Sequence, residues 1–258
     1  MKVVILAGGL PSTVSEEDEK IPKPMAEIGG RPILWHIMKS FCHFGFHDFI
    51  ICAGYKGAMI KQYFMDYYIY GSDITVDLQK NTVEILRKKT ENWNVTVVDT
   101  GLETPVTKRI ELVKDYIGEE PFIVAYGDCV SDIDISKLVE QHITGGKLAT
   151  VAVARPTGRN GIMPIGEDGL FSEDNEKTQA DAWVNACTYV FEQGIFEYLD
   201  STKSYMEQGL FNELAREQLV CAYKHQGFWS PMETRRDRSV LERMWNEGKA
   251  PWKTWRND

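Results

Sequence analysis

The first nine residues constrain the fold of this chain more than any other segment. Lys2 to Ala7 is an apolar run rich in β-branched residues, as in a buried strand of a parallel sheet, and Gly8-Gly9 ends it abruptly. A glycine turn after such a strand brings backbone N–H groups to the carboxyl edge of the sheet, where open α/β folds bind phosphates. The segment therefore predicts an α/β protein with an anion site beside its first strand. It is not the Gly-x-Gly-x-x-Gly pattern, because Pro11 stands where a further glycine is expected and has no N–H.

The same arrangement of a hydrophobic strand ended by glycine recurs along the chain. Residues 48–54 and 94–101 repeat it, and apolar residues at helical spacing in 33–41 and 58–68 predict helices between the strands. This alternation predicts a parallel sheet with right-handed crossovers. The sequence also predicts strands at 122–126, 149–154, 182–191 and 221–225, an edge hairpin over 73–79 and 81–87, helices at 107–117, 135–144 and 235–246, and short helices near 196 and 211.

Composition narrows the partners and the compartment. The chain has 258 residues, enough for one large α/β domain, and a net charge of −9 without any basic block. That balance argues against a nucleic acid or an anionic membrane as the main partner, and suggests that a polyphosphate ligand arrives with a divalent cation. The five cysteines are scattered and never spaced as Cys-x-x-Cys. They fit a reducing cytoplasm, and the spacing supports neither a disulfide framework nor a structural zinc site. With no signal peptide and no membrane-spanning run, we expect a soluble, cytoplasmic protein.

Two charged residues stand at the positions where such a fold does chemistry. Asp128 follows the predicted strand 122–126 and Gly127, which places its carboxylate at the same sheet edge as Gly8-Gly9, as a hard-oxygen ligand for Mg²⁺. Lys23 lies between Pro22 and Pro24 on stiff backbone, so little entropy is lost in directing its charge at an anion. Asp134 is predicted to cap the helix at 135–144.

With these motifs in place, the chain resembles the sugar-phosphate nucleotidylyltransferases, and within them the glucose-1-phosphate cytidylyltransferases. The resemblance runs nearly end to end. Its most specific parts are residues 4–10, 22–25, 28–39, 48–57, 93–101, 126–128 and 227–229 and the aromatic tail 248–255.

The resemblance implies the architecture and the reaction. It implies a Rossmann-like, mostly parallel sheet flanked by helices, with a small β-rich acceptor-binding and C-terminal subregion. We expect a single domain over 1–258, with a nucleotide-binding half at about 1–145 and an acceptor-binding and oligomerisation part at 146–258. The implied activity is Mg²⁺-dependent transfer of CMP from CTP to a phosphorylated acceptor, with release of pyrophosphate. Family members assemble as oligomers, so a homo-oligomer is expected, and the aromatic tail is expected to pack on a neighbouring subunit or on the body.

The resemblance also assigns roles to individual residues. Lys23, Asp128 and Lys177 are implied as catalytic residues, and Asp128 and Glu233 as the metal ligands, Glu233 having one methylene more than the family's aspartate. Glu176, Lys177 and Asn185 are implied in acceptor binding. The expected nucleotide-binding residues are Leu6, Gly8, Gly9, Ser12, Thr13, Lys23, Lys108, Arg109 and Asp128.

Several positions depart from the family pattern. Pro11 and Thr13 stand where the signature loop has a glycine and an arginine, and Lys108 or Arg109 is a candidate for the missing positive charge. Cys129, Ala186 and Cys187 replace glycines around the expected acceptor site. Three interpretations follow: a cytidylyltransferase acting on glucose 1-phosphate or a close variant, one acting on another phosphate or phosphonate acceptor, or a nucleotide-binding subunit with impaired catalysis.

Overall fold

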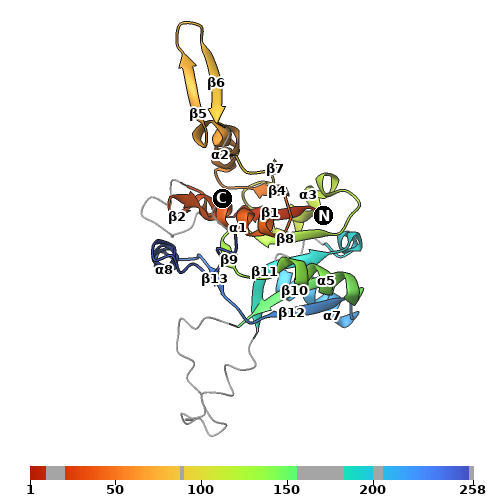
Figure 1. Ribbon diagram of the computed structural model, residues 1–258. Coiled ribbons are helices and arrows are strands. Elements are labelled where there is room, and N and C mark those ends of the chain that lie inside the picture. Colours follow the sequence, from red (N-terminus) through yellow and green to blue (C-terminus); the bar gives the residue numbers. More distant parts are fainter. Residues whose placement is uncertain (10–20, 88–89, 156–182, 200–205, 256–258) are drawn as a thin grey trace.

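The computed structural model describes residues 1–9, 21–87, 90–155, 183–199 and 206–255 (Figure 1). Its centre is a seven-stranded sheet in the order β12-β10-β11-β8-β1-β4-β7, in which β11 alone runs antiparallel to its neighbours. The predicted α/β class with a mostly parallel sheet is therefore confirmed. The strands of this sheet are β1 (Val3–Ala7), β4 (Asp48–Ala53), β7 (Asn94–Asp99), β8 (Phe122–Tyr126), β10 (Ala149–Ala154), β11 (Val184–Phe191) and β12 (Val220–His225).

The sheet packs between two layers of helices because its strands alternate between two apolar faces. In β1, Val3, Ile5 and Ala7 face one core, and Val4 and Leu6 face the other. Helices α1 (Ile33–His43), α2 (Gly57–Tyr70), α5 (Ile135–Gly145) and α8 (Arg235–Asn246) contribute to the first core; α3 (Val106–Leu112), α4 (Lys114–Ile117), the 3₁₀ turn η2 (Gln193–Glu197), the π-turn η3 (Met206–Leu210) and α7 (Phe211–Arg216) contribute to the second. None of the helices within these described ranges is both long and apolar enough to cross a membrane.

The structure differs from the expected elements in two places. The helix predicted over 107–117 is divided at Val113 into α3 and α4. The predicted hairpin, β5 (Asp73–Asp77) and β6 (Thr82–Arg87), does not join the edge of the main sheet but forms a separate ribbon that projects from the body (Figure 1). Short ribbons β2 (Glu27–Ile28) with β3 (Arg31–Pro32) and β9 (Cys129–Ser131) with β13 (Trp229–Pro231), and the 3₁₀ turn η1 (Lys23–Met25), complete the described elements.

The C-terminal tail packs on the body, which is one of the two placements expected from its aromatic sequence. Trp252 is fully buried and Trp255 nearly so, both against α1. The Trp252 Nε1–H donates to His36 Nδ1 at 3.4 Å, while His36 Nε2 lies 2.8 Å from the Ile28 carbonyl oxygen. A neutral imidazole satisfies both contacts, with Nε2–H as donor and Nδ1 as acceptor.

Stability should therefore depend on the protonation of His36. Burial lowers the His36 pKa from 6.5 to about 4. The folded state thus disfavours the proton that the unfolded chain accepts below pH 6.5, so stability should fall as the pH drops from about 6.5 to about 4. At about 1.4 kcal/mol per pKa unit, the loss is about 3 kcal/mol. Urea unfolding at several pH values would measure this slope. His36→Gln, which keeps a donor but does not titrate, should flatten the slope, and an equally steep slope in the variant would contradict the assignment.

Candidate active site

An open pocket of about 370 Å³ lies at the carboxyl edge of the sheet, within the size range of small-molecule sites. Its walls come from the turn after β1, the Lys23 turn, helix α3 and the turn after β8. The predicted residues among those that line it are Leu6, Gly8, Gly9, Lys23, Arg109 and Asp128. The edge predicted to bind phosphate is thus hollowed, and residues from four separated segments meet there.

Lys23 and Asp128 form an ion pair in this pocket. The Lys23 Nζ lies 2.8 Å from Asp128 Oδ2, and both side chains are about a quarter exposed, at 25% and 21%. Gly127 makes this approach possible, because a Cβ atom at that position would stand 3.2 Å from Pro24 Cγ and 3.1 Å from the Leu6 carbonyl oxygen. Burial alone would lower the Lys23 pKa, but the attraction of Asp128 and its hydrogen bond, with weaker attractions from Cys129 and Glu233, raise it overall. The ammonium group is therefore charged at neutral pH.

The second predicted metal ligand is brought to Asp128 by a short ribbon. Strands β9 and β13 pair antiparallel, with Cys129 opposite Pro231, and the Met232 N–H donates to the Asp128 carbonyl oxygen at 2.8 Å. Glu233 follows directly, near enough for its charge to raise the Lys23 pKa. Helix α8 holds this end in place through its cap, in which the Thr234 side chain accepts from the Asp237 N–H. The ribbon therefore holds the backbone that carries Glu233 against the turn that carries Asp128.

The donor chemistry of this group fits a hard divalent cation. Asp128 and Glu233 offer carboxylate oxygens, and in the described ranges no third His, Cys, Asp or Glu completes a protein-only metal cage with them. Two carboxylates with the remaining positions left to phosphate and water is the pattern that Mg²⁺ prefers. The Lys23 ammonium, held at 2.8 Å by Asp128, shows that this carboxylate already attracts a cation.

Arg109 lies under the first glycine turn. A Cβ atom at Gly8 would stand 2.1 Å from Arg109 Nη1, so the guanidinium packs directly against the glycine. Its Nη1 donates to Thr100 Oγ1 at 2.6 Å and to the Gly101 carbonyl at 2.8 Å, and its Nη2 donates to the Leu102 carbonyl at 3.0 Å. Burial lowers the Arg109 pKa, although attraction to Cys52 and Asp99 works against this. An arginine stays protonated even so, which places a fixed cation at the floor of the pocket.

Of the two candidates for the missing positive charge, Arg109 is the one that lines the pocket. Lys108, one residue earlier on α3, forms an ion pair with Glu111 at 2.8 Å, and both side chains are over a third exposed. Adjacent residues on a helix point about 100° apart, so only one of the two can face the sheet. Both residues were candidates because neither residue type reveals which side of so short a helix faces the sheet.

Asn185 lies next to this pocket, on the strand beside β8. Its Nδ2 donates to the Tyr189 hydroxyl at 2.5 Å, and its Oδ1 accepts from the Cys187 N–H at 2.9 Å. The second bond holds Cys187 in the left-handed region at φ 60°, a conformation that favours glycine. A hydrogen bond with Cys187, then burial and the nearby Asp128 carboxylate, raise the pKa of the Cys129 thiol. The two cysteines that replace family glycines are thus in contact with each other.

Four predicted site residues lie outside the described residues, and the structure gives no account of them. They are Ser12 and Thr13 in the signature loop and Glu176 and Lys177 in the acceptor region. In return, the structure adds pocket residues that sequence reasoning did not name: Tyr55, Val106 and Tyr126. Tyr126 could have been predicted as a pocket residue, because it ends the strand before Gly127-Asp128 and residues at the carboxyl end of a central strand commonly face the ligand.

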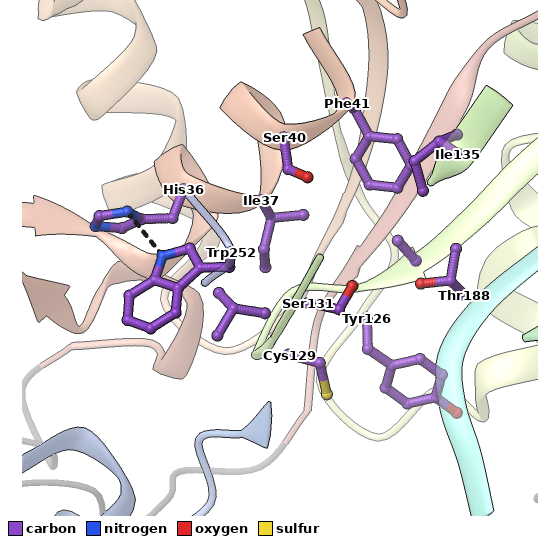
Figure 2. A pocket seen from close by; sticks show the side chains of 12 residues that line it. His36, Ile37, Ser40, Phe41, Tyr126, Cys129, Ser131, Ile135, Thr188 and Trp252 are labelled. Atoms are coloured by element: carbon purple, nitrogen blue, oxygen red, sulfur yellow. Dashed lines mark hydrogen bonds between the residues drawn. The ribbon is translucent and has the colours of Figure 1, made fainter. Parts of the chain in front are cut away.

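A smaller cavity of about 20 Å³ lies behind the site, between α1, α5 and β8. Figure 2 shows His36 and Trp252 on one side of it, joined by their hydrogen bond, and Cys129, Tyr126 and Thr188 on the other. Its size suits about one water molecule. It is therefore part of the packing behind the Asp128 turn and too small for a substrate.

We compared the sequence and the fold of this chain with those of known proteins. Residues 2–234 match the family model described as nucleotidyl transferase. The glucose-1-phosphate cytidylyltransferase of Salmonella typhi is 44% identical over 257 residues, which covers 99% of this chain and 100% of that protein. Among solved structures, the UDP-glucose pyrophosphorylase of Acinetobacter baumanii has a TM-score of 0.68 at 16% identity, covering 93% of this chain and 91% of that one. HddC from Yersinia pseudotuberculosis, complexed with GMP-PN, has a TM-score of 0.65 at 20% identity, covering 95% and 99%.

Proposed function

This chain belongs to the nucleotidyl transferase family, and on that premise we propose that it transfers CMP from CTP to glucose 1-phosphate and releases pyrophosphate. The observation that carries the proposal is the ion pair of Lys23 with Asp128 in the pocket at the carboxyl edge of the sheet, beside the Gly8-Gly9 turn and Arg109. The 44% identity to a cytidylyltransferase along the whole chain supports the choice of CTP and of this acceptor.

The displacement needs positioning and neutralisation of charge more than covalent help from the protein. Asp128 and Glu233 would hold Mg²⁺, which neutralises phosphate charge and orients the phosphates when it is bound. The Lys23 ammonium, preorganised by its proline-flanked turn, would donate to the triphosphate oxygens. The backbone N–H groups of Gly8 and Gly9 would bind the same anion, with the fixed charge of Arg109 beneath them.

The acceptor would bind on the side of Asn185, so that its phosphate oxygen can attack the α-phosphorus in line with the leaving pyrophosphate. Glu176 and Lys177 are proposed to grip the acceptor phosphate, as the resemblance implies. The side chains of Cys129 and Cys187 occupy space in this region that glycines would leave open, so the acceptor pocket would be narrower than in a glycine-containing relative. This is the observation that keeps a different phosphate or phosphonate acceptor as the second candidate.

The compartment, the domain organisation and the oligomeric state are each proposed on a separate observation. All five cysteines are free thiols, which suits a reducing cytoplasm. The main sheet combines strands from both halves of the chain, which supports a single domain. We propose a homo-oligomer because the projecting β5–β6 ribbon, including the turn between its strands, exposes several apolar side chains. Among them, Leu78 is 88% exposed and Val83 58%.

A panel assay of pyrophosphate release tests the function. With Mg²⁺, CTP and glucose 1-phosphate, the protein should release pyrophosphate faster than with ATP, GTP or UTP in place of CTP. A signal only with another phosphorylated or phosphonate acceptor would move the assignment to the second candidate. Binding of CTP without turnover on any acceptor would instead indicate a nucleotide-binding subunit with impaired catalysis. Omission of Mg²⁺ should abolish the signal.

A further inference from the structure

Two cations and an indole ring form a cluster at the same sheet edge as the pocket. Arg155 directly follows β10, Trp183 directly precedes β11, and Lys224 lies in β12. The guanidinium carbon of Arg155 lies 5.3 Å from the centroid of the Trp183 ring, and the Lys224 Nζ lies 5.6 Å from it. Both cations are exposed and the indole is half-buried. One aromatic ring thus positions two like charges at the surface.

The strand register places this cluster beside Asn185. Val153 pairs with Asn185 on one side and with Lys224 on the other, so these three residues form one row across the sheet. Arg155 and Trp183 each lie two residues from a member of that row, hence on the same face. Since β11 runs antiparallel to β10 and β12, the end of each strand that carries the cluster lies at the carboxyl edge (Figure 1).

Contacts between side chains connect the cluster to the pocket. Tyr126 lines the pocket, and its ring meets the Tyr189 ring edge-on at a centroid distance of 6.2 Å. The Tyr189 hydroxyl accepts from Asn185 Nδ2 at 2.5 Å. The cluster is therefore continuous with the acceptor side of the pocket, on the face of the sheet that also carries Leu6 and Tyr126.

The charges of the cluster are unusual for this protein. The chain carries a net charge of −9, yet neither Arg155 nor Lys224 forms an ion pair with a carboxylate in the described ranges. Like charges held on one ring repel each other, and a bound anion would offset that repulsion. In a protein of net negative charge, such paired cations attract an incoming anion.

The position of the cluster separates its ligand from the reacting phosphate. The cluster centres on β10, which is two strands away from β8, where Asp128 lies. With strands about 4.8 Å apart, that separation is roughly 10 Å. We propose that Arg155, Trp183 and Lys224 bind a second anionic group of the acceptor, such as a carboxylate or a phosphate, at the end remote from its reacting phosphate. This inference rests on the proposed function and extends its acceptor from glucose 1-phosphate to sugar 1-phosphates that carry a second anionic group.

Acceptors that differ only in the remote group test the proposal. Pyrophosphate release with CTP would be compared for glucose 1-phosphate, glucuronic acid 1-phosphate and glucose 1,6-bisphosphate. The wild-type protein should give a higher kcat/KM with the two acceptors that carry a second anionic group. The double variant Arg155→Gln, Lys224→Gln should lose about tenfold in kcat/KM for those acceptors, since each exposed ion pair is worth only a few-fold. Its kcat/KM for glucose 1-phosphate should change by less than twofold.

The double variant Lys80→Gln, Lys249→Gln provides the matched control, because both side chains are strongly exposed, at 78% and 76%, and it removes the same two positive charges. It should leave all three acceptors unaffected. The inference would be overturned if the wild type showed no preference for the acceptors with a second anionic group. It would also be overturned if the Arg155→Gln, Lys224→Gln double variant lost kcat/KM equally on all acceptors. If no acceptor is turned over, the proposed function fails, and calorimetric binding of glucose 1,6-bisphosphate then decides: weaker binding to the double variant supports the cluster, and equal binding refutes it.

Discussion

Asp128→Asn is expected to abolish Mg²⁺-dependent turnover, with a loss of roughly 10³-fold or more in kcat. The amide keeps the shape of the side chain but removes the charge that would hold the metal and that binds Lys23 at 2.8 Å. The fold should survive, because Asp128 is at the pocket wall and its carbonyl still accepts from Met232. Pyrophosphate release over a Mg²⁺ titration would measure the loss, with thermal unfolding followed by circular dichroism as the check on folding.

Asp115→Asn is the matched control for this prediction. It makes the same chemical change on the exposed surface of α4, away from the pocket, and should leave turnover within twofold of the wild type. Unchanged Mg²⁺-dependent activity in Asp128→Asn would remove Asp128 from the metal site. Such a result would also leave the Lys23–Asp128 pair with a purely structural role.

Gly8→Ala is expected to destabilise the protein by roughly 2 kcal/mol and to prevent CTP binding. The new methyl group would stand 2.1 Å from Arg109 Nη1, so the guanidinium would have to leave its buried position. That movement relieves the clash but breaks the hydrogen bonds to Thr100, Gly101 and Leu102, at a cost of about 1–3 kcal/mol. Urea unfolding and CTP titration by calorimetry would measure the two effects.

A double-mutant cycle identifies the cause. Arg109→Met, a shorter apolar side chain, should partly relieve the clash, so Gly8→Ala should cost less in its presence than in the wild type. Gly145→Ala serves as the steric control, because its Cβ atom would meet only Cys221 Sγ, at an ordinary 4.0 Å. Equal costs of Gly8→Ala with and without Arg109 would show that the guanidinium is not what the glycine accommodates.

Much of the fold was predictable because its signals are local. The strand at β1 was identified by its β-branched run and its Gly-Gly end, and Asp134 was correctly identified as the cap of α5, where its side chain accepts from the Lys137 N–H. The hairpin β5–β6 was also predicted, but its placement was not. Alternation of apolar and polar residues specifies a ribbon, whereas its docking depends on contacts that the alternation does not encode.

In the candidate site too, some residues were predictable from local signals and others depended on tertiary contacts. Position in the chain was enough to place Gly8 and Asp128 at the carboxyl edge, since both follow strands of one parallel sheet. The choice between Lys108 and Arg109 required the phase of α3 against the sheet. The contact between Cys129 and Cys187, 58 positions apart in the sequence, required the turn after β8 and the bulge in β11 to meet.

The sequence by itself determined the alternating α/β order, the carboxyl-edge glycines and acids and, through its motifs, the family. These follow from periodicity and turn chemistry, which act over a few residues. Only the tertiary structure decided that the β9–β13 ribbon brings the segment before Glu233 to Asp128, that Arg109 lies under Gly8, and that Arg155, Trp183 and Lys224 form a cluster. Those contacts join segments far apart in the chain, and their geometry is set by sheet register and helix packing rather than by local preference.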